Sequence, residues 1–120
     1  MNALLFVYGT LKKGCRNHAH LADQTFVGAA RSIPGFGLFD LGSYPGIVAD
    51  PQDSAGVIGE VWSVSYQCLE ELDAFEGVHR GFYRRAALPL VPPFADQKIE
   101  AYIYALSIAG RRRLGPEWKN

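Results

Sequence analysis

Glycine and proline interrupt this sequence so often that long helices are not expected. Thirteen glycines and seven prolines occupy 20 of the 120 positions, and both residue types are frequent in turns. The segments between them are short, which favours many short strands over a helix bundle. A chain of this length is expected to form one domain, 1–120, and it can bury roughly two-thirds of its unfolded surface without a metal or a disulfide.

Hydrophobic patterning predicts the strands that lie between these breaks. Residues 3–7 form an apolar run without alternation, which indicates a strand buried on both faces. Further strands are expected over residues 25–31, 36–41, 47–49, 56–64, 82–91 and 99–106. From Gly110 onward the chain is basic and then polar, so residues 110–120 are expected to form a loosely held tail.

One helix is marked at both ends. Ser65 is a suitable N-cap, and Leu69, Leu72 and Phe75 repeat at the spacing of an apolar helix face. Gly77 is a suitable residue to end this helix.

A shorter helix is expected over residues 17–23, with Asn17 as its cap. The predicted strands do not alternate with helices of 10–15 residues, as they would in a doubly wound fold. The sequence therefore predicts an α+β fold, a small mixed β-barrel with one or two flanking helices.

Charge and cysteine content exclude several classes of protein. Twelve basic and twelve acidic residues give a net charge of +0, whereas nucleic-acid binding needs a concentrated positive field. The apolar run at residues 3–7 is far shorter than the ~20 residues of a membrane-spanning helix, and it lacks the flanks of a signal peptide. The two cysteines are expected to be reduced thiols of a cytoplasmic protein. Neither a nucleic-acid partner nor a membrane partner is expected.

The loop after the first strand is the first candidate site. It contains Tyr8, Gly9, Thr10 and Leu11. One interpretation is a tight turn in which Gly9 supplies an unusual dihedral angle. The other is a backbone cradle, in which successive N–H groups bind one anionic group such as a carboxylate.

Glu76 is the second candidate, because it is the last residue before the glycine that ends the helix. A carboxylate at the negative end of a helix dipole is disfavoured, which raises its pKa, and burial would raise it further. Such a group suits proton transfer near neutral pH, although the same position also fits an exposed helix end that tolerates any residue. Glu60 is a strand carboxylate, and Tyr83 begins the strand after the helix.

A metal site has weaker support. Cys15, His18, His20 and Asp23 lie close together in the sequence, but their spacing is loose compared with that of closed zinc sites. No metal and no other cofactor is expected.

Four motifs, in their order and spacing, give the sequence a family resemblance. The chain resembles the gamma-glutamylcyclotransferase-like family, and its compact branch that includes the gamma-glutamylamine cyclotransferases. The resemblance is carried by Val7-Tyr8-Gly9-Thr10-Leu11, the loop 41–46, Gly59-Glu60-Val61-Trp62, and Leu72-Asp73-x-Phe75-Glu76-Gly77 with Tyr83-x-Arg85.

This resemblance implies an activity and a set of roles. The substrate would be a small-molecule gamma-glutamyl amide, whose alpha-amine attacks its own gamma-carbonyl and releases 5-oxoproline and a free amine. Tyr8 to Leu11 would hold the alpha-carboxylate and amine end, Glu76 would be the general base, and Tyr83 would line the pocket. The protein would work as a monomer or weak homodimer. Two alternatives stay open: a noncatalytic module that binds gamma-glutamyl metabolites, and a protein-interaction subunit whose barrel is filled by side chains.

Overall fold

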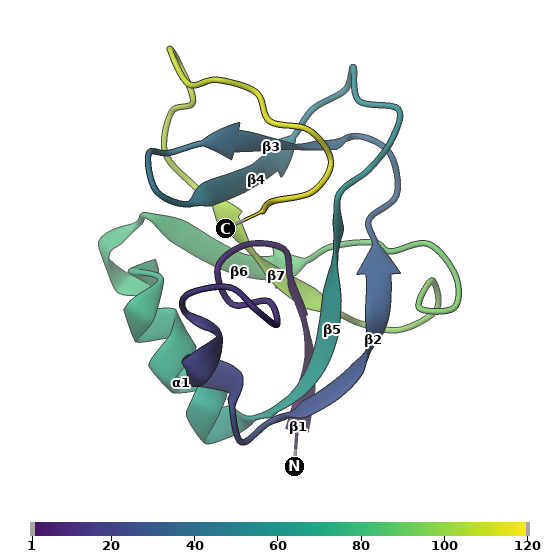
Figure 1. Cartoon of the computed structure of the whole chain (residues 1–120), viewed down its shortest axis with the longest axis vertical. Helices are drawn as coiled ribbons and strands as arrows, with labels where there is room; N and C mark the ends of the chain where they lie inside the picture. Colours follow the sequence, from purple (N-terminus) through teal and green to yellow (C-terminus); the bar gives the residue numbers. More distant parts are fainter. Residues whose placement is uncertain (1, 120) are drawn as a thin grey trace.

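The computed structural model describes residues 2–119, which contain seven short strands and one α-helix (Figure 1). Two short 3₁₀ helices, η1 (His18–Leu21) and η2 (Val78–Arg80), lie next to this α-helix. No helix in the described residues is long and apolar enough to cross a membrane. In chain order the elements are β1 (Asn2–Val7), η1 (His18–Leu21), β2 (Thr25–Arg31), β3 (Phe36–Asp40), β4 (Pro45–Ala49), β5 (Ile58–Ser65), α1 (Tyr66–Phe75), η2 (Val78–Arg80), β6 (Tyr83–Ala87) and β7 (Glu100–Tyr104).

The sheet divides at β7. The strand order is β2-β5-β1-β7-β4-β3, and β6 also pairs with β7. Because β6 runs antiparallel along the whole of β7, β1 and β4 must share the other edge of that strand. β1 pairs with β7 near its start, at Leu5 and Glu100, and β4 pairs near its end, at Ile47 and Ile103. The two strands therefore diverge beside the middle of β7.

The side chain of Tyr8 lies at this divergence. Its hydroxyl donates to the carbonyl oxygen of Tyr102 at 2.5 Å and accepts from the backbone N–H of Ile47 at 3.3 Å. A buried backbone group without a partner is costly, and here a side chain supplies the missing partner. Tyr8 thus fixes the loop after β1 against both β4 and β7.

The expected small mixed β-barrel differs from the structure in one respect, because the sheet does not close. Among the described residues β2 and β3, at the two ends of the strand order, do not pair with each other. The divergence of β1 and β4 sends the β3–β4 hairpin away from β5 and β2, so the sheet stays open (Figure 1). The α+β class and the flanking helices agree with the sequence prediction.

The sheet is covered on both faces, as the apolar run in β1 predicted. Leu5 and Val7 belong to the core cluster that packs against Leu69 and Leu72 of α1. Phe6 belongs to the cluster on the opposite face, which is closed by the loop after β6 and by residues near the C-terminus. The inner part of β1 is therefore fixed from both sides, which makes it a rigid support for the loop that follows.

One helix cap agrees with the sequence expectation, and two other details of the helices differ from it. Ser65 caps α1 as predicted, accepting from the N–H of Cys68 at 3.1 Å. Phe75, expected on the buried face, is 43% exposed, because it lies at the last turn, beyond the edge of the core. Asn17 makes no cap hydrogen bond in η1; its side chain donates instead to the hydroxyl of Thr10 at 2.9 Å.

The C-terminal segment is held more firmly than expected. Leu114 donates its N–H to Leu38 at 2.8 Å, and the N–H of Asp40 donates to Arg112 at 2.8 Å. The side chains of Leu114 and Trp118 pack against the core. The segment thus lies along β3 and covers part of the sheet, where the sequence suggested a loosely held tail.

Candidate functional site

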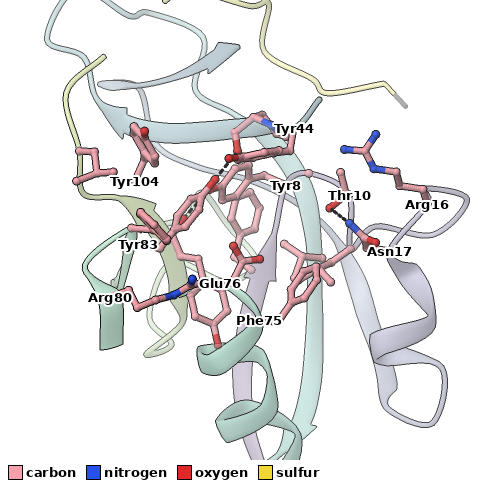
Figure 2. A pocket seen from close by; sticks show the side chains of 18 residues that line it. Tyr8, Thr10, Arg16, Asn17, Tyr44, Phe75, Glu76, Arg80, Tyr83 and Tyr104 are labelled. Atoms are coloured by element: carbon pink, nitrogen blue, oxygen red, sulfur yellow. Dashed lines mark hydrogen bonds between the residues drawn. The ribbon is translucent and has the colours of Figure 1, made fainter. Parts of the chain in front are cut away.

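A cavity of about 390 Å³ opens where β1 and β4 diverge (Figure 2). Its wall is formed by the loop after β1, the start of β4, the end of α1, the start of β6 and the end of β7. All six site residues predicted from the sequence line this one cavity: Tyr8, Gly9, Thr10, Leu11, Glu76 and Tyr83.

The loop after β1 has backbone N–H groups without protein partners. Within residues 2–119, the N–H groups of Gly9, Thr10 and Leu11 donate to no other protein group. Their carbonyl oxygens are occupied: Lys12 donates to Gly9 at 3.2 Å and Asn17 donates to Thr10 at 3.0 Å, while the ring of His18 donates to Leu11 at 2.8 Å. Successive free N–H groups on a fixed loop suit the binding of an anion.

Gly9 is needed for close packing and not for an unusual dihedral angle. It is absent from the glycines that adopt positive φ. A Cβ built on Gly9 would lie 2.9 Å from Cγ of Pro45, which is closer than side chains normally approach. The loop therefore lies directly against the start of β4, and glycine makes this approach feasible.

Glu76 caps the C-terminal end of α1, and Gly77 then turns the chain with φ of 69°. A Cβ on Gly77 would lie 2.6 Å from the ring of Phe82, so glycine serves both the turn and the packing. Figure 2 shows the Glu76 carboxylate directed into the cavity between Tyr8 and Phe75. Among the described residues that line the cavity, it is the one carboxylate.

Burial raises the pKa of the Glu76 carboxyl to about 7. The apolar and aromatic wall disfavours the charged form, because less water surrounds it there. The sequence predicts two causes of a raised pKa, the helix dipole and, in addition, burial, and in the structure the cause is burial. A carboxyl that titrates near neutrality can both accept and return a proton.

The two tyrosines of the predicted site are committed to the scaffold. The hydroxyl of Tyr8 bridges β4 and β7, as described above, and that of Tyr83 donates to the carbonyl oxygen of Pro45 at 3.0 Å. Burial raises the pKa of both phenols well above the usual value. Both residues therefore shape the wall, and neither is suited to act as a base at neutral pH.

An ion-pair network fixes the last turn of α1. Arg85 of β6 contacts Asp73 at 2.9 Å and Glu100 at 2.6 Å. Tyr102 of β7 also donates to Asp73, at 2.6 Å. Because Asp73 lies one turn before Glu76, these bonds hold the helix end against the sheet and direct Glu76 into the cavity.

Several lining residues were not identified as site residues from the sequence. Tyr102 and Tyr104 had a signal, since alternation places both on one face of β7, and Tyr44 lies in a loop of the family resemblance. The others lacked a signal, because their position depends on contacts between distant elements. Among the missed residues are Arg16, Asn17, Tyr44, Arg80, Phe82, Tyr102, Tyr104 and Leu106.

The remaining polar candidates lie outside the cavity. Glu60 accepts from the N–H of Lys13 at 3.0 Å and from the indole of Trp62 at 3.1 Å. The residues considered for a metal site, Cys15, His18, His20 and Asp23, belong to no cluster of three or more such side chains in the described chain. His20 instead stacks on Phe75, with ring centroids 4.2 Å apart.

Comparisons with known proteins converge on one family. The family model described as "Gamma-glutamyl cyclotransferase, AIG2-like" matches residues 5–120. A Vibrio cholerae protein, whose name assigns it provisionally as a gamma-glutamylcyclotransferase, is 42% identical over 104 residues, covering 87% of this chain and 84% of that protein. The human gamma-glutamylaminecyclotransferase is 31% identical over 133 residues, covering 97% of this chain and 83% of that protein.

A solved structure supports the same relationship. The crystal structure of an AIG2-like protein from Mus musculus matches with a TM-score of 0.71 and 30% identity. The match covers 88% of this chain and 78% of the mouse chain. Sequence and fold therefore agree on the same group of proteins.

Proposed function

We propose that this chain, which belongs to the gamma-glutamyl cyclotransferase, AIG2-like family, cyclises the gamma-glutamyl group of a small-molecule amide. The products are 5-oxoproline and a free amine. The observation that carries this proposal is the position of Glu76, a carboxylate with a pKa near neutrality that shares a cavity with the free N–H groups of the loop 9–11.

Binding is assigned to the loop after β1. The free N–H groups of Gly9, Thr10 and Leu11 suit the alpha-carboxylate of the substrate, and the buried ring of Tyr83 forms the wall beside it. Held in this way, the gamma-glutamyl chain is folded so that its amine lies near its own gamma-carbonyl carbon.

The reaction needs one group that moves protons. Glu76 takes a proton from the alpha-ammonium group, and the freed nitrogen attacks the gamma-carbonyl carbon to close a five-membered ring. The bond between this carbon and the amide nitrogen then breaks as Glu76 returns that proton to the departing nitrogen. The ring nitrogen releases its second proton, which the departing amine takes up, so that 5-oxoproline with a neutral ring amide and a protonated amine are the products. The carboxylate is regenerated, and no covalent bond to the enzyme forms.

Positioning supplies much of the rate acceleration. Well-oriented intramolecular attack reaches effective molarities of ~10⁵ M or more. Negative charge develops on the gamma-carbonyl oxygen as the ring closes, and loop N–H groups are candidates to stabilise it. In this mechanism neither a metal nor another cofactor takes part.

A noncatalytic module that binds the same metabolites would need the loop but not the carboxylate. The raised pKa of Glu76 favours the enzyme, because binding alone gives no reason for an acid that titrates near pH 7. We further propose that the chain acts as one cytoplasmic domain, monomeric or weakly dimeric, without nucleic-acid or membrane partners.

The test is a panel of gamma-glutamyl compounds incubated with the purified protein in buffer containing a metal chelator. We expect equimolar 5-oxoproline and free amine from at least one compound, at a rate that the chelator does not change. Release of glutamate, or no turnover with any compound, would contradict the proposed reaction. Loss of turnover on chelation that zinc restores would contradict the metal-free mechanism alone.

A further inference from the structure

The cavity changes in character from its inner end to its mouth. The inner wall is buried, with Tyr8 and Thr10 only 6% and 8% exposed. The outer wall consists of exposed apolar side chains, among them Phe75 at 43% and Phe82 at 40%. Tyr44 and Leu106 contribute to the same rim. A substrate held at the inner loop by its glutamyl end would place its departing amine against this rim.

The charges at the rim are positive. Arg16 and Arg80 line the cavity, and Glu76 is the one carboxylate among its described lining residues. Arg16 is engaged, since its guanidinium donates to the carbonyl oxygen of Ser43. Arg80 makes no side-chain hydrogen bond and no ion pair within residues 2–119; its guanidinium lies 4.9 Å from the centre of the Phe82 ring. Stacking restrains the group while its N–H edges stay free to bind a ligand.

From this arrangement we propose that Arg80 is a specificity-determining residue that binds a carboxylate on the departing amine. The preferred substrates are gamma-glutamyl conjugates of bulky, apolar alpha-amino acids. This inference rests on the proposed cyclotransferase function and adds the identity of the group beyond the gamma-amide.

The position of Arg80 relative to Glu76 fits this role. The departing nitrogen must reach Glu76 to receive its proton, and an alpha-amino acid carries its carboxylate on the carbon next to that nitrogen. Arg80 follows Glu76 by one tight turn, with its N–H donating to Gly77 at 3.0 Å. Figure 2 shows both side chains on the wall formed by this segment. A guanidinium there can bind a carboxylate through two parallel hydrogen bonds.

The rest of the departing group is selected by the rim. The apolar side chain of the amino acid would contact Phe75 and Phe82, whose exposed rings lose contact with water on binding. A cationic group, such as the free end of a diamine, would face Arg16 and Arg80 and be repelled. The same rim therefore favours one class of substrate and opposes another.

The experiment compares two matched substrates, gamma-glutamyl-phenylalanine and gamma-glutamyl-phenethylamine, which differ by the carboxylate alone. For the unmodified protein we expect kcat/KM to be about tenfold higher for the phenylalanine compound. In Arg80→Gln this preference should fall to about one, through a higher KM for the phenylalanine compound, and the readout is the ratio of the two kcat/KM values on the same variant. Since both substrates are measured on the same variant, a loss of folded protein cannot alter the ratio.

Two further variants complete the test. Arg84 is exposed and points to the other face of β6, so Arg84→Gln is the matched control and should keep the tenfold preference. Equal rates for both substrates in the unmodified protein, or a preference that Arg80→Gln leaves intact, would overturn the inference. A preference removed by Arg16→Gln and not by Arg80→Gln would also overturn it. Each of these outcomes requires turnover, so they are distinct from failure of the proposed function, in which no compound gives 5-oxoproline.

Discussion

Replacement of Glu76 by glutamine is expected to lower kcat for 5-oxoproline release by about 10²–10⁴-fold. Glutamine keeps the size of the side chain but cannot accept a proton at neutral pH. The change in KM should be much smaller, because the free N–H groups that bind the substrate lie on the loop after β1. Steady-state kinetics on one substrate of the panel, with both kcat and KM determined, measure this split.

Glu60→Gln is the control for this variant. Glu60 lies outside the cavity and uses one oxygen to accept from Lys13 and Trp62, and the amide oxygen of glutamine can accept in the same way. It should keep most of the activity. Normal turnover by Glu76→Gln together with its loss in Glu60→Gln would show that the base is the other carboxylate.

The Glu76→Gln substitution should also make the folded protein more stable than the parent at high pH. The folded protein raises the pKa of Glu76 to about 7 from an ordinary value of 4.5. Below pH 4.5 the carboxyl is protonated in both the folded and the unfolded state, and the variant and the parent should be equally stable. Between pH 4.5 and pH 7 the parent loses stability, because the carboxyl ionises in the unfolded state while burial keeps it protonated in the folded protein. Above pH 7, Glu76→Gln should be more stable by about 1–3 kcal/mol, as denaturant unfolding at pH 4 and pH 8 can measure.

Replacement of Gly9 by valine is expected to lower kcat/KM by about 10²-fold. A side chain at this position would press on Pro45 at the start of β4, where even a Cβ would lie 2.9 Å from Cγ. Relief of this contact moves the loop away from β4 and misplaces its free N–H groups. A displacement near 1 Å at a reacting geometry typically costs a factor of this size.

Two companion variants separate this effect from general damage to the fold. Gly9→Ala adds the Cβ alone and should give a smaller loss, with an intact thermal unfolding transition. Gly115 has ordinary φ and open space around it, so Gly115→Val should leave kinetics unchanged. Wild-type KM and kcat in a folded Gly9→Val protein would argue against the binding role of the loop.

Local patterns in the sequence predicted the elements well. The expected strand at residues 25–31 coincides with β2, and Ser65 and Gly77 mark the two ends of α1 as predicted. These signals are local, because capping and apolar repeats depend on residues close together in the chain. The sixth expected strand was too long: β6 ends at Ala87, since Pro89 has no N–H to continue the ladder.

The divergence of the sheet could not be predicted in this way. It depends on pairing between β7 and two strands distant in sequence, and on the hydroxyl of Tyr8 that joins them. The sequence predicted a small mixed β-barrel, and no residue pattern marks the break that keeps its sheet open. The cavity between these diverging strands is a consequence of the same long-range arrangement.

The candidate site shows the same limit. The sequence singled out Glu76 for its place at a helix end, yet the rise in its pKa comes from burial by side chains of other elements. Asn17 was predicted to cap a helix, whereas its side chain donates to Thr10 in the loop that lines the cavity. The residue types were thus informative, and their partners required the fold.

The pH dependence of kcat/KM for 5-oxoproline release tests the central claim most directly. If Glu76 is the base in the free enzyme, kcat/KM should fall tenfold per pH unit below an apparent pKa of about 7. The small residual kcat/KM of Glu76→Gln should not show this fall, which we call the acidic limb. A rate of the unmodified enzyme that stays constant from pH 8 down to pH 5, or the same limb in Glu76→Gln, would contradict the assignment of Glu76 as the proton-transferring residue.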